Sequence, residues 1–168
     1  MSGVIFTVGL EDAALQAGLG ALVTGLTDMT TFMDAVGRVL VNGAVQRIGS
    51  TNVSPDGTPW VPSKRATEDG GRTLVLSGIL RTSINAWAAP DHVLVGTNVP
   101  YAAVHQMGAA VGSLGIWIGE DKRGRQMTVL SPWGDIPARP YLGISRDEET
   151  DIHNLAAIHF PSLLERLQ

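Results

Sequence analysis

The sequence predicts an α+β protein in which a small antiparallel or mixed β-sheet packs against helices. Helical patterns lie near both ends of the chain, short β-branched segments lie between them, and a long segment without periodicity follows the first helices. Because helices and strands fall in separate stretches, the pattern favours segregated layers over an alternating α/β fold. The length of 168 residues predicts one domain, residues 1–168.

The first third of the chain predicts one strand and two helices. Val4–Val8 is β-branched and aromatic, which is typical of a short strand. Leu10–Leu26 follows with leucines at three- and four-residue spacing, which predicts a helix. Thr27 and Asp28 are N-cap candidates for a second helix. One face of that helix is apolar and consists of Met29, Phe32, Met33, Val36, Leu40, Ala44 and Ile48.

Residues 49–73 form a long connection that lacks periodicity, and loops of this length are usually functional or disordered. The stretch contains SPDGTPW, a turn signal with an aromatic anchor. Pro55 fixes its φ, Asp56 can accept a hydrogen bond from the backbone ahead, and Gly57 permits a positive φ. Trp60 therefore docks either on the body of its own chain or on a neighbour, and the sequence does not choose between them.

The middle of the chain predicts a short helix and a β-hairpin. Thr73–Ile84 carries leucine and isoleucine at helical spacing. Ile84–Ala88 and His92–Thr97 resemble two strands joined by a turn at Pro90-Asp91. The alternation expected of a half-buried sheet is carried by Trp87, Val93 and Val95.

The last third predicts a helical turn, two strands and a terminal helix. YAAVHQMG is expected to form a helical turn ended by Gly108. GIWIG and MTVL are short strands around a charged tip, and IPARPYLG is extended because of its two prolines. Ser145 to Glu148 is a capping box that opens the final helix, which Pro161 ends or kinks.

The composition excludes several classes of protein. With no cysteine, the chain has no disulfides and no thiol chemistry. The N-terminus lacks a basic n-region and no apolar stretch is long enough to span a bilayer, so we expect synthesis in the cytoplasm and no membrane contact. A net charge of −4 without a basic run argues against wrapping of DNA, although not against a channel through which DNA passes. Charged residues make up only 17%, which favours an interface that covers part of the surface.

His105, four residues after Tyr101, is the first candidate for chemistry. A hydrolase or nuclease would need an acid beside it, such as Asp91 or Asp121, and no motif supplies that context. The favoured interpretation is structural: the ring of His105 orders the turn through hydrogen bonds, with Tyr101 packed beside it.

Metal binding and cofactor binding are not predicted. His153 and His159 are six residues apart and do not share a helical face, so we expect an ordinary surface histidine and a partly buried one. The acidic run around Glu148 complements a helix N-terminus without a ligand, and the pattern of a calcium loop is absent. Arg139, held between Pro137 and Pro140, is expected to pair with an acid across a subunit boundary, to bind phosphate or to be solvated.

Four motifs in order, PDGTPW, LVLSGILRTSI, VLVGTNVPYAAVHQMG and IPARPYLGIS, resemble the phage virion morphogenesis family over nearly the whole chain. Met107 stands where the family commonly has an aromatic residue, and residues 109–130 match little. The motifs supply the structural and interface candidates, to which Tyr141 is added. These candidates are Asp56, Gly57, Trp60, Arg81, Tyr101, His105, Gln106, Arg139 and Tyr141.

The resemblance implies a structural virion protein of the head–tail junction or the tail end, with no catalytic residue. Copies of the chain are expected to form a ring, sixfold by analogy, between the tail tube protein and head-side connector proteins, with DNA passing through the lumen. A tail terminator and a neck connector both fit. The alternatives are an assembly chaperone absent from the mature virion and a histidine-dependent hydrolase.

Overall fold

The computed structural model describes residues 20, 23, 27–113, 116–120, 124–130 and 135–165. The strand expected at Val4–Val8 lies outside the described residues. Of the helix expected over Leu10–Leu26, the structure describes Gly20 and Val23, both with helical geometry. The described part of the chain confirms an α+β fold with small antiparallel sheets and no mixed sheet.

Helix α2, Thr30–Gln46, is the central element of the fold. It starts one or two residues later than predicted, because its N-cap position is Met29, which makes no side-chain cap bond, and not Thr27 or Asp28. The Asp28 carboxylate still accepts a hydrogen bond of 3.0 Å from the backbone N–H of Thr30. A short π-helical turn, η1, continues it over Arg47–Thr51 and ends at Asn52, which has a left-handed backbone. The predicted apolar face is confirmed where it meets the core, since Val36, Ala44 and Ile48 are buried.

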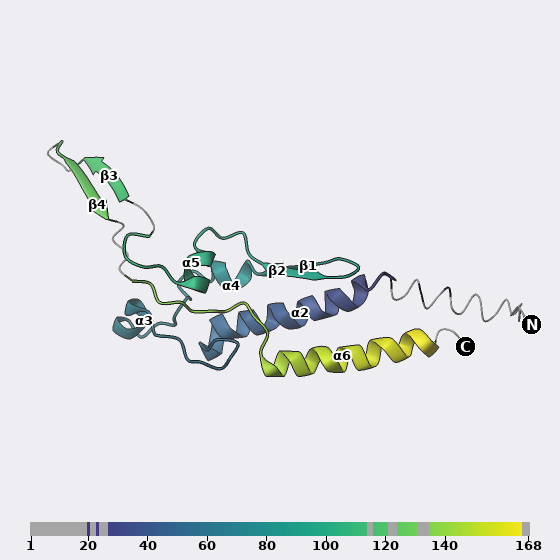
Figure 1. Cartoon of the computed structure of the whole chain (residues 1–168). Coiled ribbons are helices and arrows are strands. Elements are labelled where there is room, and N and C mark those ends of the chain that lie inside the picture. The colour runs from purple at the N-terminus through teal and green to yellow at the C-terminus, as the bar shows by residue number, and fades with distance from the viewer. Residues whose placement is uncertain are drawn as a thin grey trace, which may run out of the picture.

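Strands β1, Asn85–Ala88, and β2, Val93–Gly96, form the predicted antiparallel hairpin on one side of α2, and helix α6, Arg146–Glu165, lies on the other side (Figure 1). Ala86 and Val93 of the inner sheet face lie against Gly37 of α2. Trp87 pairs with Leu94 and therefore belongs to the opposite, outer face, unlike Val93 and Val95. Both Trp87 and Leu94 are exposed.

Helix α6 begins with the predicted capping box, since Ser145 and Glu148 exchange backbone and side-chain hydrogen bonds. The helix runs to Glu165, so the expectation that Pro161 could end it is wrong. The residues on both sides of Pro161 keep helical geometry, although the proline lacks the N–H for one bond of the helix.

The segment over residues 49–73 contains more regular structure than its sequence suggests. An isolated bridge pairs Val53 with Pro59, and helix α3 spans Lys64–Glu68. Ser63 caps α3 by accepting a hydrogen bond of 3.2 Å from the N–H of Ala66.

The helix expected over Thr73–Ile84 is limited to α4, Ile79–Thr82. Leu74 and Gly78 have positive φ values of 63° and 77°, which an α-helix does not accept, so the helix starts only after Gly78.

Helix α5, Ala102–Met107, confirms the predicted helical turn and ends at Gly108. Strands β3, Ile116–Glu120, and β4, Gln126–Leu130, confirm the second predicted hairpin, which projects away from the helices (Figure 1). The core lies around the C-terminal end of α2, where α2, α4 and α5 meet the extended segment of residues 136–143. Its buried apolar members are Ala44, Ile48, Trp60, Leu80, Ile84, Ala102 and Tyr141.

Candidate functional site

The turn of residues 53–59 has the geometry that its sequence predicts. Gly57 has a φ of 87° and donates a backbone hydrogen bond of 2.9 Å to the carbonyl of Ser54. Asp56 accepts a bond of 2.9 Å from the N–H of Thr58, and this bond lowers the pKa of its carboxyl group. Both Asp56 and Gly57 are exposed at the tip, so they shape the turn and stay accessible.

Trp60 docks on its own chain. Its side chain is buried, and its indole Nε1–H lies 3.1 Å from the hydroxyl of Ser54 and 3.2 Å from the carbonyl of Pro140. Of the two possibilities left open by the sequence, the structure has the loop folded back on its own domain. Trp60 thereby joins the turn to the extended segment 136–143.

Gln106 fixes that extended segment with its side-chain amide. Its Oε1 accepts bonds of 3.0 Å from the N–H groups of Tyr141 and Leu142, and its Nε2 donates a bond of 3.0 Å to the carbonyl of Leu142. Tyr141 is almost fully buried and donates its hydroxyl to the carbonyl of Ala102 at 3.1 Å. Burial raises the pKa of this phenol. Helix α5 and the segment are therefore joined by the side-chain hydrogen bonds of Gln106 and Tyr141.

Replacement of Gln106 by leucine is expected to lower the free energy of unfolding by about 1–3 kcal/mol, because two backbone N–H groups lose their acceptor in a partly buried place. Urea unfolding followed by circular dichroism measures the change. Gln46→Leu, the same substitution at an exposed position of α2, is the matched control and is expected to change stability by less than about 0.5 kcal/mol. Equal effects of the two substitutions would contradict the conclusion that the Gln106 amide fixes the extended segment.

Of the environments expected for Arg139, the solvated one is wrong, and the bonds of its side chain within this chain go to backbone carbonyls. The side chain is buried, and it donates to the carbonyl of Val61 from Nε at 2.8 Å and to that of Pro62 at 3.5 Å. Its backbone N–H donates to the carbonyl of His105 at 2.8 Å. The two prolines keep the segment extended, which directs the arginine inward onto the loop that follows Trp60. Arg139 therefore holds two loops together and is closed to phosphate.

His105 lies beside Tyr101 as predicted, with ring centroids 5.8 Å apart in an edge-to-face arrangement. Its predicted ordering by ring hydrogen bonds is wrong for Nδ1, which is buried and has no hydrogen-bond partner in the described part of the chain. The order comes from the backbone carbonyl of His105, which accepts from Arg139. Asp91 is bonded to His92 at 2.6 Å in the β1–β2 turn, so among the described residues it is not the acid that hydrolysis with His105 would need. Asp121 lies outside the described residues.

The protonation of His105 makes stability depend on pH. Burial, and then the charge of Arg139, lower the pKa of His105 from its ordinary value of 6.5. The unfolded chain then takes up a proton at a higher pH than the folded chain does. The free energy of unfolding therefore falls as the pH drops from about 6.5 to the lowered pKa of the folded state.

We expect His105→Gln to remove this contribution when urea unfolding is compared across about pH 5 to 8. His153→Gln, at an exposed position of α6, serves as the control that keeps it. An unchanged pH profile in His105→Gln would show that this histidine does not carry the effect.

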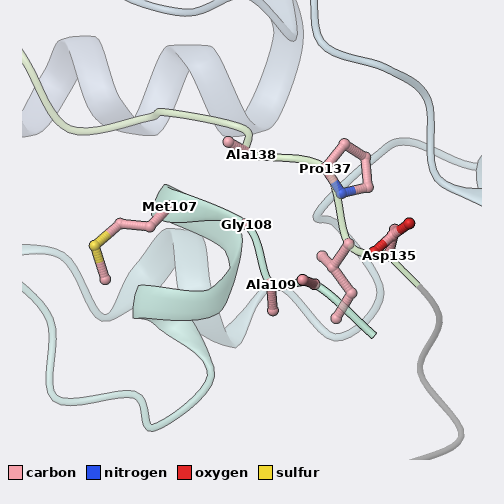
Figure 2. A pocket seen from close by; sticks show the side chains of 8 residues that line it. Met107, Gly108, Ala109, Asp135, Pro137 and Ala138 are labelled. Carbon is pink, nitrogen blue, oxygen red and sulfur yellow. The ribbon is translucent and has the colours of Figure 1, made fainter. Parts of the chain in front are cut away.

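Gly108 allows the closest approach between α5 and segment 136–143. It has a φ of 77°, and a Cβ at this position would lie 2.8 Å from the nitrogen of Ala138 and from the oxygen of Ile136. A shallow hollow of about 320 Å³ lies here (Figure 2). Among the described residues that line it, Asp135 is the one titratable group, and it already accepts a bond from the N–H of Val111 at 3.0 Å. The hollow therefore lacks the paired groups that acid–base chemistry needs.

Arg47 and Glu148 form a buried ion pair that the sequence interpretation missed. Arg47 also donates to the carbonyls of Tyr141 at 2.9 Å and Gly143 at 3.4 Å, so it ties α2 to segment 136–143 and to α6. The expectation that the acidic run acts only on the helix dipole is therefore incomplete. The missed signal was the position of Arg47, seven residues after Leu40 on the apolar face of its helix.

Arg81 is exposed and lies against Gly49 in η1, away from the hydrogen bonds that join α5 to segment 136–143. His153 is exposed and His159 is partly buried, as predicted. Over the described ranges, no cluster of three or more histidine, aspartate and glutamate side chains could hold a metal ion. Within the same ranges no helix is long and apolar enough to cross a membrane.

The site is thus a structural junction in which most of the sequence-predicted residues meet. Its members are Trp60, Gln106, Arg139 and Tyr141, with Arg47 and Glu148 behind them and the Tyr101–His105 pair at its edge. Residues 10–160 match the phage virion morphogenesis family. The chain belongs to this family.

A similar protein supports the same assignment. Mu-like prophage FluMu G protein 2 of Haemophilus influenzae is 32% identical over 113 residues, which are 67% of this chain and 67% of that protein. No solved structure matches the chain. Family membership confirms the resemblance seen in the four motifs and supports a structural role in phage virion morphogenesis.

Proposed function

We propose that the protein is a structural component of the phage head–tail junction or tail end, a tail terminator or neck connector. It acts by forming a ring of identical copies that docks between the tail tube and the head-side connector. The observation that carries the proposal is that the motif residues Gln106, Arg139 and Tyr141 are used to hold the chain's own backbone in shape. Because these side chains bond the backbone of their own chain, they fix the shape of the surface that the chain presents.

The arrangement of the elements supports assembly through two different surfaces. The outer face of the β1–β2 hairpin exposes Trp87 and Leu94, whereas its other face packs on α2. A ring needs a heterologous contact, in which two unlike patches of neighbouring copies meet and the rotation closes. The exposed apolar face of the hairpin suits one of these two patches.

The charge of the protein suits passage of DNA through the ring. The net charge of −4 provides no excess of basic groups to neutralise phosphates, so DNA in the lumen would be held weakly and without sequence preference. Sixfold symmetry, matched to the tail, is the ring number that we propose by analogy.

Mass spectrometry of purified virions from the phage or prophage that encodes the chain tests this placement. The protein is expected in mature particles, in a few copies relative to the abundant tail tube protein. Its absence from mature particles, together with its presence in assembly intermediates, would contradict the proposal and identify an assembly chaperone.

A further inference from the structure

The outer face of the β1–β2 hairpin is an apolar surface that the described residues leave uncovered. Trp87 and Leu94 are cross-strand partners and are 60% and 61% exposed. Asn85 lies on the same face, two residues before Trp87, and is also exposed. The opposite face of the hairpin packs on α2. A large aromatic and a leucine paired on an open sheet face are typical of a surface that meets another segment.

The N-terminal segment is an apolar partner of matching chemistry. Twenty-six residues precede Thr27, and Leu15, Leu19, Leu22 and Leu26 are spaced as one stripe of a helix. The segment enters the described structure beside the hairpin, because the N–H of Met29 donates a 3.0 Å bond to the carbonyl of Pro90 in the β1–β2 turn. Thr27, which directly follows Leu26 in the sequence, is therefore two residues from this bond to the hairpin of its own chain.

The described part of this segment is not buried against its own chain. Val23 and Thr27 are helical, and the Thr27 hydroxyl donates to the carbonyl of Val23 at 2.7 Å. Val23, which follows Leu22 directly and borders the stripe, is 62% exposed.

We propose that residues 10–26 of one copy pack their leucine stripe on the outer face of the β1–β2 hairpin of a neighbouring copy, which rests on the proposed ring. Segment and face are unlike surfaces of the same chain, so the contact is heterologous and is repeated around a closed ring. The face thereby obtains an occupant from the protein itself.

Disulfide trapping between single-cysteine variants tests the contact, because the natural chain has no cysteine. Val23→Cys borders the stripe, and Asn85→Cys borders the Trp87–Leu94 pair without altering it. The two full-length variants are mixed, assembled and oxidised, and cross-linked dimers are counted by non-reducing electrophoresis. The matched control mixes Val23→Cys with Asp151→Cys, an exposed position of α6.

The expected result is a cross-link in the Val23→Cys and Asn85→Cys mixture at least tenfold more abundant than in the control. Rings that form, as judged by light scattering, but give no excess cross-link would overturn this contact and leave the proposed function standing. Absence of any assembly would contradict both. A further variant carries Val23→Cys and Asn85→Cys on the same chain. If only this variant forms the cross-link, and only within single chains, the segment lies on its own sheet and the contact between copies is overturned.

A second pair of variants tests the same contact without cysteine. Leu19→Asp with Leu22→Asp is expected to raise the protein concentration needed for half-assembly at least tenfold, and so is Trp87→Lys. Far-UV circular dichroism and the melting temperature of the monomer are expected to stay unchanged for Trp87→Lys, because Trp87 is exposed on its own chain. Unchanged assembly in either variant would overturn the contact.

Discussion

Replacement of Glu148 by glutamine is expected to lower the free energy of unfolding by about 3–5 kcal/mol. The shape of the side chain is kept, but its charge is lost while Arg47 stays buried at the centre of the structure. Removal of one partner of a buried pair leaves an uncompensated charge away from water, which costs far more than the pair itself contributes. Guanidinium unfolding of the full-length chain measures the loss.

Two controls separate the buried charge from a general loss of carboxylates. Glu68→Gln breaks the exposed ion pair with Lys64 on α3 and is expected to cost less than about 0.5 kcal/mol. The double variant Arg47→Met with Glu148→Leu removes both charges and is expected to recover most of the stability lost in Glu148→Gln. A double variant as unstable as Glu148→Gln would show that the bonds of Arg47 to Tyr141 and Gly143 carry the stability instead.

Trp60→Ala is expected to lower the free energy of unfolding by about 3–5 kcal/mol, because it removes a large buried aromatic side chain from the core and leaves a cavity. The substitution also removes the indole donor that faces Ser54 and Pro140. The turn of residues 53–59 then loses its attachment to segment 136–143. Thermal unfolding followed at 222 nm measures the effect, and protease sensitivity of the turn is expected to increase with it.

Trp87→Ala is the matched control for Trp60→Ala, because it removes the same side chain from an exposed sheet face. It is expected to change the stability of the monomer by less than about 1 kcal/mol. Trp60→Phe keeps most of the apolar volume but not the donor, and is expected to cost about 1–3 kcal/mol. A loss in Trp87→Ala equal to that in Trp60→Ala would contradict the division between a core tryptophan and a surface one.

Local signals in the sequence predicted the local structures well. The turn at Pro55-Asp56-Gly57, the hairpin around Pro90-Asp91 and the capping box of α6 depend on residues within a few positions of one another. The residues that form each of these structures are close in sequence, so the local sequence is enough to predict them.

Long-range partners were the part that the sequence could not supply. Arg139 bonds carbonyls 77 and 78 positions earlier in the chain, and Arg47 pairs with an acid 101 positions later. A position on an apolar helix face, as for Arg47, indicates that a charged side chain is buried, but no local pattern identifies its distant partner. The face occupied by Trp87 was ambiguous for a similar reason, because alternation fixes which residues share a face but not which face meets the helix.

Size-exclusion chromatography with multi-angle light scattering, paired with negative-stain imaging, tests the central claim most directly. The claim is that the chain works by shape, as one unit of a closed ring. The predicted result is a single species whose mass is a whole multiple of the 17.7 kDa chain, with annular particles in the images. A species that stays at the mass of one chain at every concentration tested would contradict it.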